Sequence, residues 1–266
     1  MEWNTPVEIN SPTWKIAPTD NILCVGSCFA DNIGRKFEEA LFFITCNPYG
    51  VMYNPISILH SLTRWLTDTT ERPDVVILTL GTNHVYRLKR TGEIVDNCQK
   101  QPQSCFQEEE LSVADCAKAL EEAIQQVRNR NANAKVVLTV SPIRYQKYGF
   151  HGSQLSKATL LLATHELVKA GTVDYFPAYE IMNDALRDYR FYAEDMLHPT
   201  PQAVNYIWEA FGKAYFSAET HDYLCEWQPI KAALNHRPFD AESDAYKAFR
   251  AKAEQQKQAF LKKWKG

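Results

Sequence analysis

The segment NILCVGSCFADNIG, residues 21–34, joins a short apolar run to a polar segment through Gly26 and Ser27. The apolar run predicts a buried strand over residues 21–26. The segment after it predicts a helix over residues 28–42, because apolar side chains recur there at helical spacing. These side chains are Phe29, Ile33, Phe37 and Leu41. Ser27 therefore lies where a strand surfaces and a helix begins. It is either a small turn residue or a nucleophile directed into a cleft.

Three further apolar segments have the character of strands. PDVVILTLGTN, residues 73–83, ends in Gly-Thr-Asn, and AKVVLTVSP, residues 134–142, is stopped by a proline. TVDYFP, residues 172–177, predicts a fourth and shorter strand. Between residues 84 and 110 the sequence predicts only a small hairpin, with its turn at Thr91-Gly92.

Helical patterns separate these strands. Residues 56–68 and 153–170 are expected to be helical, and Gly171 ends the second of these helices. Ser112 and Asp115 form a predicted capping box that opens a helix reaching about residue 129. Another helix is expected to begin after Thr200, with Pro201 at its first position. Apolar strands that alternate with helices are typical of a parallel sheet covered on both faces. The sequence therefore predicts an α/β fold, a three-layer, doubly wound and mostly parallel sheet.

The composition is that of a soluble globular protein with a substantial core: 266 residues, 45% hydrophobic and 23% charged. The formal net charge of -3 gives no indication of nucleic-acid binding, which calls for a basic surface. The seven cysteines include no C-x-x-C pair, so reduced thiols are expected rather than a disulfide framework. No apolar run approaches the roughly 20 residues that span a bilayer, and the N-terminus lacks the pattern of a signal peptide. These features predict a cytoplasmic protein without a membrane span.

The C-terminal part differs from the rest. We expect residues 1–217 to form the α/β domain and residues 218–266 a helical extension packed on it. The last helix carries one apolar stripe. The stripe consists of Phe249, Ala253, Phe260 and Trp264. Packing of this helix on the domain or on a partner subunit is the favoured interpretation. Binding of its basic residues to an acidic surface or membrane is the alternative.

In parallel sheets the ligand crevice lies beyond the carboxyl ends of the strands, which is where Ser27 is expected. Further along the chain, YAEDMLHPTPQA, residues 192–203, places Asp195 and His198 three positions apart before a helix. Pro199 disfavours helix at the histidine and keeps it on a loop. In such a turn the carboxylate can hold one imidazole nitrogen while the other faces a nucleophile. The combination favours acyl-transfer chemistry at Ser27.

Four segments resemble blocks of the GSCFA family, which is named for residues 26–30 and is similar to the SGNH (GDSL-like) hydrolases. The resemblance covers residues 20–216. The blocks are GSCFADNIG (26–34), NPYGVMYNPISI (47–58), LSKATLLLATHELV (155–168) and YRFYAEDMLHPTPQAVNYIW (189–208). The resemblance implies that Ser27 is the nucleophile, His198 the general base and acid, and Asp195 its orienting partner. It also implies an oxyanion hole formed by the Ser27 and Gly50 backbone N–H groups and the Asn83 side-chain amide.

The resemblance further implies a serine esterase or deacetylase that needs no cofactor or metal. Its substrate would be a small-molecule or saccharide ester with a small, acetyl-like acyl group. His84, Arg144 and His151 are candidates for substrate contact, because they follow strand ends. The alternative is a non-catalytic ligand-binding protein on the same fold.

Other catalytic arrangements fit less well. The G-x-S-x-G elbow of α/β-hydrolases is excluded, because Val25 and Phe29 stand where its glycines would be. Cys28 at a helix N-terminus is an alternative nucleophile, although packing behind the turn is the favoured interpretation. The phosphate-loop motif G-x-x-x-x-G-K-[ST] does not occur. The histidines show no zinc-ligand spacing. They are His60, His84, His151, His165, His198, His221 and His236.

Overall fold

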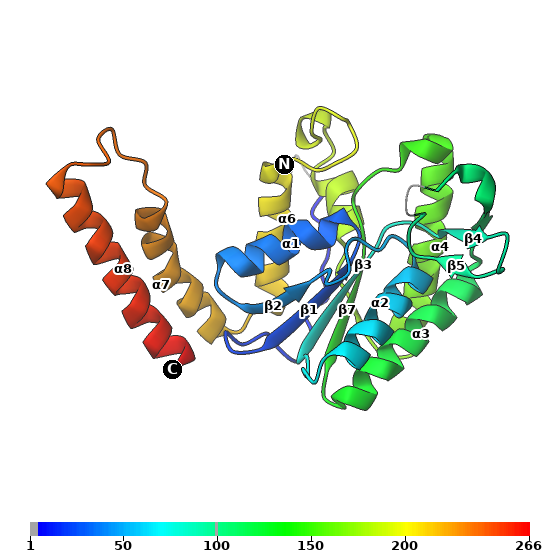
Figure 1. Ribbon diagram of the computed structural model, residues 1–266, viewed down its shortest axis with the longest axis horizontal. Coiled ribbons are helices and arrows are strands. Elements are labelled where there is room, and N and C mark those ends of the chain that lie inside the picture. The colour runs from blue at the N-terminus through cyan, green and yellow to red at the C-terminus, as the bar shows by residue number, and fades with distance from the viewer. Residues whose placement is uncertain (1–4, 99–100) are drawn as a thin grey trace.

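A five-stranded parallel sheet forms the centre of the molecule (Figure 1). The computed structural model describes residues 5–98 and 101–266. The strand order is β2-β1-β3-β7-β8, and every neighbouring pair is parallel. The strands are β2 (Phe43–Cys46), β1 (Asn21–Gly26), β3 (Val75–Leu80), β7 (Lys135–Val140) and β8 (Asp174–Tyr175). This topology confirms the predicted α/β class.

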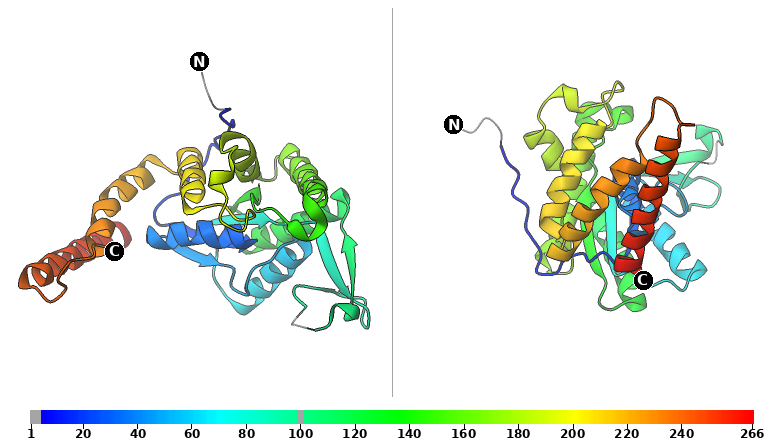
Figure 2. Two further views of the ribbon diagram at one scale, coloured as in Figure 1. Left: turned by 90° about the horizontal axis from the view of Figure 1, so that it is seen from above. Right: turned by 90° about the vertical axis from the view of Figure 1, so that its left-hand side faces the viewer.

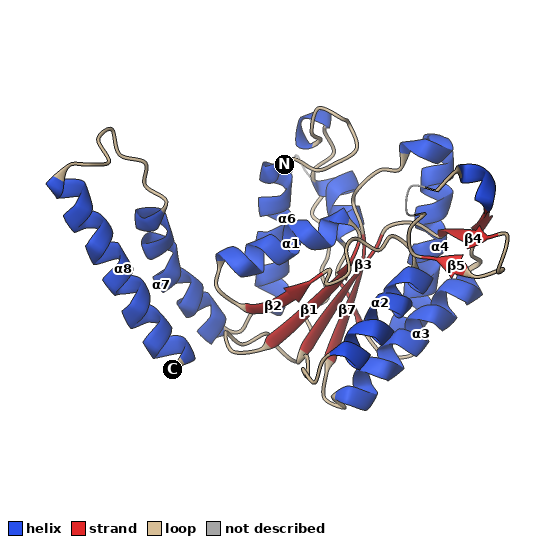
Figure 3. Cartoon of the chain, in the orientation of Figure 1, coloured by secondary structure: helices blue, strands red, loops and turns tan. Residues whose placement is uncertain are grey.

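Helices cover both faces of the sheet (Figure 3). On one face lie α1 (Cys28–Glu39) and α6 (Pro201–Tyr215). On the other lie α2 (Pro55–Asp68), α3 (Val113–Arg130) and α4 (Gly149–Lys169). The strands supply both cores, because successive side chains point to opposite faces. In β1, Ile22 and Cys24 face α1 and α6, while Leu23 and Val25 face the other three helices.

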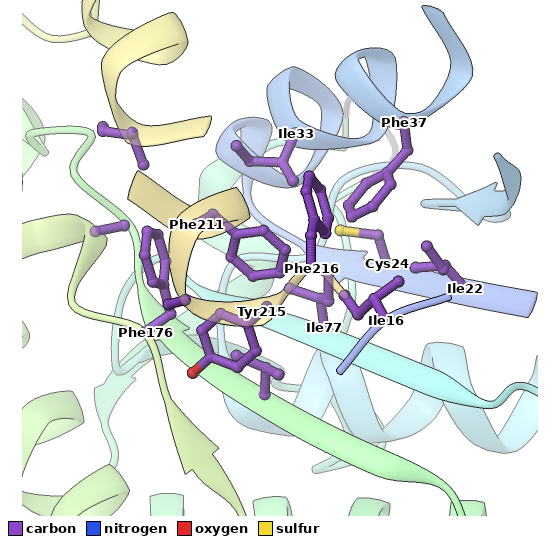
Figure 4. Packing of buried hydrophobic residues seen from close by; sticks show 14 of the residues in the cluster. Ile16, Ile22, Cys24, Ile33, Phe37, Ile77, Phe176, Phe211, Tyr215 and Phe216 are labelled. Atoms are coloured by element: carbon purple, nitrogen blue, oxygen red, sulfur yellow. The ribbon is translucent and has the colours of Figure 1, made fainter. Parts of the chain in front are cut away.

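The core beneath α1 and α6 is rich in aromatic rings (Figure 4). Phe37 of α1 lies edge-on to Phe211 of α6, with ring centroids 6.1 Å apart. Phe211 also stacks on Tyr215 at 4.6 Å. Such pairs add about 0.5–1.5 kcal/mol each to the burial of apolar area. This packing fixes α6, and with it the end of the loop that precedes it.

The first helix is shorter than predicted. It ends at Glu39 rather than at residue 42, because the chain turns at Leu41, whose φ is 60°. The next residues form β2, an edge strand that the sequence did not reveal. The capping box of Ser112 and Asp115 at the start of α3 is confirmed.

A small antiparallel sheet lies beside the main one, at the end of the molecule away from β2 (Figure 1). It consists of β4 (His84–Leu88), β5 (Ile94–Val95) and β6 (Phe106–Glu110) in the order β5-β4-β6. The predicted hairpin is therefore present, but its third strand was not predicted. Arg87 of β4 pairs with Glu109 of β6 at 3.0 Å, which explains how a glutamate-rich strand is held.

The C-terminal segment forms the helical hairpin α7 (Ala218–Leu234) and α8 (Asp244–Lys265), which projects beside the β2 edge (Figure 2). Ala253 and Phe260 are buried as predicted, but Phe249 is 42% exposed and lies outside the packed stripe. Within the described residues, no helix is both long and apolar enough to cross a membrane. Short helical turns complete the chain. They are η1 (Gln103–Cys105), η2 (Gln146–Tyr148), α5 (Ala178–Glu180), the π-helix η3 (Ile181–Ala185) and η4 (Tyr189–Phe191).

Candidate active site

Ser27 is the N-cap of α1 and follows β1 directly. Its hydroxyl oxygen accepts a hydrogen bond from the Phe29 N–H at 3.3 Å and lies 3.2 Å from Thr79 Oγ1. Its backbone N–H donates to the Thr79 carbonyl at 3.0 Å, continuing the ladder between β1 and β3. The residue is 2% exposed. In this structure Ser27 is therefore a buried helix cap, and both its hydroxyl and its backbone N–H have hydrogen-bond partners.

The turn before Ser27 requires glycine. Gly26 has a φ of 147°, and a Cβ there would lie 2.1 Å from the Thr79 carbonyl oxygen. Asn47 holds the turn from the other side, since its Oδ1 accepts from the Gly26 N–H at 2.8 Å. The Asn47 amide in turn donates to Asp31 of α1 at 2.6 Å. Asn47 and Asp31 are positioning residues that sequence reasoning missed. Their side chains meet only because β1, α1 and the loop after β2 converge here.

Asp195 and His198 form the expected pair. Asp195 Oδ2 lies 2.6 Å from His198 Nδ1, and Asp195 Oδ1 accepts from the Leu197 and His198 N–H groups at 2.8 and 3.0 Å. Those two backbone hydrogen bonds, followed by the one from the imidazole, lower the pKa of Asp195 to about 2. The carboxylate is therefore ionised at neutral pH and faces the imidazole. Both side chains are partly exposed, at 42% for His198 and 45% for Asp195.

Arg144 ties this loop to the sheet. It follows β7, and its backbone N–H donates to the Leu197 carbonyl at 3.1 Å. Its guanidinium donates to the Met196 carbonyl at 3.2 Å and lies 3.9 Å from the centre of the Phe150 ring. Arg144 thus holds the Asp195–His198 loop at the carboxyl edge of the sheet. The predicted contact of Arg144 with substrate stays a prediction.

Asn83 lies in the Gly-Thr-Asn turn after β3 and is 3% exposed. Its side-chain amide donates to the Leu111 carbonyl at 2.8 Å. Among the described residues its Oδ1 has no hydrogen-bond partner, although it is buried. Gly50 is exposed, and its N–H donates to the Asn47 carbonyl at 2.8 Å. Each predicted oxyanion donor, the Ser27 N–H included, therefore has an acceptor within the protein. The Asn83 amide keeps a second hydrogen that can be donated.

Two adjacent residues of α4 hold the Gly-Thr-Asn turn. The Ser156 hydroxyl accepts from the Asn83 N–H at 3.0 Å and lies 3.0 Å from Thr82 Oγ1. Lys157 is 2% exposed, and its Nζ donates to the Gly81 carbonyl at 2.7 Å. Burial lowers the pKa of Lys157 to about 7. Sequence reasoning missed both residues. The available signal was that Lys157 is the one lysine, arginine, aspartate or glutamate of the sequence between residues 148 and 165.

Within the described part of the chain, the structure brings Asp195 and His198 together but shows no hydrogen bond between His198 and Ser27. The triad therefore stays a prediction. His84 is buried against Tyr148, with stacked rings 3.6 Å apart, and burial lowers its pKa. His151 lies exposed in the first turn of α4 rather than on the expected loop, because the helix begins at residue 149.

Comparison with protein families decides the assignment. The model of the GSCFA family matches residues 21–73 and 66–211. A second model, described as "GSCFA domain protein, C-terminal domain", matches residues 227–265. The chain belongs to the GSCFA family. No curated protein matches this GSCFA chain.

Solved structures similar to this GSCFA protein are SGNH and GDSL-like hydrolases. A member of the lipolytic G-D-S-L family from Veillonella parvula has a TM-score of 0.50 and 12% identity, covering 73% of this chain and 97% of that chain. A carbohydrate esterase of family 3 from Talaromyces cellulolyticus has a TM-score of 0.47 and 12% identity, covering 78% and 99%. An acetyl-xylooligosaccharide esterase from Geobacillus has a TM-score of 0.48 and 13% identity, covering 75% and 95%. The first of these supports the SGNH-like fold, and the other two scores are too low to add to it.

The remaining groups near Ser27 fit a packed turn in this GSCFA protein. Cys28 Sγ lies 3.4 Å from the Tyr53 hydroxyl, so the thiol faces a neighbouring loop. Among the described residues, no group of three or more histidine, cysteine, aspartate or glutamate side chains is placed to hold a metal ion. The side chains at the site are a hydroxyl, an imidazole–carboxylate pair and an amide.

Proposed function

We propose that this GSCFA protein is a serine esterase that cleaves small acyl esters through an acyl-Ser27 intermediate. One observation carries the proposal: the ionised Asp195 is bonded to His198 at the edge of the sheet where the Ser27 turn also lies. A carboxylate that binds Nδ1–H leaves Nε2 as the basic nitrogen. Such a pair activates a serine hydroxyl that comes within hydrogen-bond reach.

The reaction begins with a change of partner at Ser27. Its hydroxyl rotates away from Thr79 Oγ1 and donates to His198 Nε2 as substrate enters. The oxygen attacks the ester carbonyl while His198 takes the proton. The alcohol leaves with that proton, and the acyl group stays on Ser27. Water then loses a proton to His198, attacks the acyl carbon, and releases the acid and the free serine.

Charge on the tetrahedral oxygen needs donors that are already oriented. The second hydrogen of the Asn83 amide is the best placed of the predicted donors, because Leu111 and Ser156 fix the residue at both its side chain and its backbone. Removing one such donor from a comparable site costs about 3–4 kcal/mol of barrier. The Gly50 N–H is the weakest candidate, because it is exposed and closes its own turn.

The fold comparison supports a hydrolase. The Veillonella protein is described as lipolytic, and this chain covers 97% of it. We further propose a reducing, cytoplasmic location, where the seven cysteines, which include no C-x-x-C pair, would stay reduced.

The test is active-site labelling with a fluorophosphonate, followed by hydrolysis of short-chain aryl esters. We expect the wild type to be labelled, and Ser27→Ala and His198→Ala to lose both labelling and hydrolysis. Cys28→Ala is the matched control, because it changes the neighbouring side chain and should keep both. Circular dichroism checks folding, since Ser27→Ala also removes a helix cap and costs about 1 kcal/mol. Labelling that survives Ser27→Ala but not Cys28→Ala would reassign the nucleophile.

One observation favours the alternative of a ligand-binding protein. The Ser27 hydroxyl is buried and paired with Thr79 rather than with His198. A folded wild type that takes up no fluorophosphonate and hydrolyses no ester would support this alternative.

A further inference from the structure

A cavity of about 500 Å³ lies between the start of α4, the π-helix η3 and the η4 loop. Its size is within the roughly 300–1,000 Å³ of small-molecule sites. A larger cavity of about 1160 Å³ lies between residues 7–14, α4 and β8, and is lined by none of the predicted site residues. The smaller cavity, by contrast, is lined by Arg144.

This cavity adjoins the loop that carries Asp195 and His198. Arg144 in its wall bonds the carbonyls of the two residues that precede His198. Tyr192, also in the wall, pairs with Pro199 on the other side of that histidine. A third wall residue, Tyr179, lies with its ring 6.0 Å from Lys157 Nζ, which holds the Gly-Thr-Asn turn. The wall therefore contacts the Asp195–His198 loop directly, and Lys157 lies between it and the Gly-Thr-Asn turn.

Three tyrosines and several uncharged or paired polar groups line the cavity. Tyr189 is 69% exposed, Tyr179 and Tyr192 are partly exposed, and only Met182 and Leu186 add non-aromatic apolar surface. Tyrosine rings offer an apolar face with a polar edge. A long acyl chain would require a more apolar lining. The tyrosines suit a ring with apolar C–H faces and hydroxyls at its rim.

The charges in the cavity balance. Arg144 and Arg187 oppose Asp184 and Asp188, so the lining has no formal net charge. In the described chain, neither the Asp184 carboxylate nor the Arg187 guanidinium has a hydrogen-bond or salt-bridge partner, and both are exposed. Such groups can bind hydroxyls of a ligand. A phosphate or anionic headgroup would favour a net positive lining instead.

The wall between Tyr179 and Leu186 includes the π-helix η3, residues 181–185. π-Helical turns are rare and frequently occur at functional sites. Here the wider turn presents Asn183 and Asp184 to the cavity.

We propose that this cavity binds the sugar part of a neutral saccharide ester, with a ring stacked on Tyr189 or Tyr192. The proposal rests on the proposed function only for the role of the sugar as leaving alcohol; binding of the sugar itself does not require catalysis. Saccharides without an ester therefore serve as probes of the wild-type protein.

The experiment is saturation-transfer NMR with xylotetraose, cellotetraose and chitotetraose. We expect at least one to bind with a dissociation constant below about 10 mM. Tyr189→Ala should weaken that binding about tenfold, equivalent to about 1.4 kcal/mol, and Asp184→Asn should weaken it as well. Both residues are exposed, so their variants should fold. Tyr206→Ala is the matched control: this tyrosine is 41% exposed but lies on α6 outside the cavity.

Parallel fluorophosphonate labelling separates the two proposals. Saccharide binding that depends on Tyr189 without labelling supports the cavity and removes the esterase. Labelling without saccharide binding removes the cavity proposal and leaves the esterase. Binding that Tyr189→Ala, Asp184→Asn and Tyr206→Ala leave unchanged would also overturn the cavity proposal.

Discussion

Asp195 serves two structural purposes through its two carboxylate oxygens. One oxygen closes the turn on the Leu197 and His198 N–H groups, and the other binds the imidazole. Its pKa is lowered from 3.8 to about 2, so folding favours the ionised form. The contribution of this ionisation to stability is complete above about pH 4 and is lost as pH falls towards 2. The carboxylate therefore stays ionised throughout the neutral range, as its proposed orienting role requires.

Asp195→Asn tests the orienting role at the residue scale. The asparagine oxygen can still close the turn, but its amide cannot accept the Nδ1–H of His198. We expect kcat/KM to fall on the order of 10³–10⁴-fold, because the imidazole is left in the wrong tautomer. Ester hydrolysis and the rate of fluorophosphonate labelling both report the effect. Glu194→Gln, which changes the exposed acidic neighbour, is the control and should act like wild type. Equal rates for the two variants would remove Asp195 from the mechanism.

Among the elements, strands with apolar residues on both faces could be predicted. β1, β3 and β7 were identified in this way, and so was the capped start of α3. β2 was missed because the apolar run of residues 40–46 continues across the end of α1. Leu41 marks that break with a left-handed conformation that usually calls for glycine. β6 was missed because its glutamates pair with distant residues that sequence spacing does not reveal: Glu109 with Arg87 of β4 and Glu108 with Lys147 of η2.

The residues of the candidate site, too, could be predicted only in part from the sequence. Ser27, Asp195 and His198 could be singled out because each stands in a short local motif. Asn47, Asp31 and the Ser156–Lys157 pair could not, because their partners come from segments distant in the chain. Local motifs thus supplied the candidate reacting groups, which stay predictions, while the contacts around them depend on tertiary structure.

Lys157→Met tests how α4 supports the turn after β3. Burial lowers the pKa of Lys157 from 10.5 to about 7, so folding disfavours its charged form. Between these pH values the unfolded chain binds a proton that the folded chain does not, and wild-type stability should rise with pH. The methionine variant lacks this rise. The unfolding free energy of wild type minus that of the variant should therefore increase by a few kcal/mol from about pH 7 to pH 10.

Urea denaturation at several pH values measures that difference. Lys169→Met on the same helix is the control, because this lysine is exposed and should give no such trend. A difference between wild type and Lys157→Met that stays constant with pH would mean that Lys157 titrates normally. Slower fluorophosphonate labelling of Lys157→Met would indicate, in addition, that the Gly-Thr-Asn turn after β3 helps to position the proposed reacting groups.

At the scale of the whole molecule, the C-terminal hairpin shares the core of the α/β body. Tyr223 of α7 lies 5.5 Å from Phe42 between ring centroids and donates to the Ala40 carbonyl at 2.8 Å. Trp227, which is 3% exposed, donates to the Glu39 carbonyl at 2.8 Å. These contacts join the hairpin to the end of α1, whose last carbonyls would otherwise lack partners. The hairpin is therefore expected to unfold together with the body, although a separate family model matches residues 227–265.

Trp227→Ala tests this coupling. Removing a buried indole should lower the free energy of unfolding by about 3–5 kcal/mol. Phe249→Ala is the matched control: this aromatic residue lies on the same hairpin but is 42% exposed. It should change stability by less than about 1 kcal/mol. Circular dichroism and fluorophosphonate labelling should follow one coincident transition in wild type and in both variants. If labelling instead survives a first transition in which helical signal is lost, the hairpin is a separate folding unit. The boundary at residue 217 would then separate two cooperative folding units.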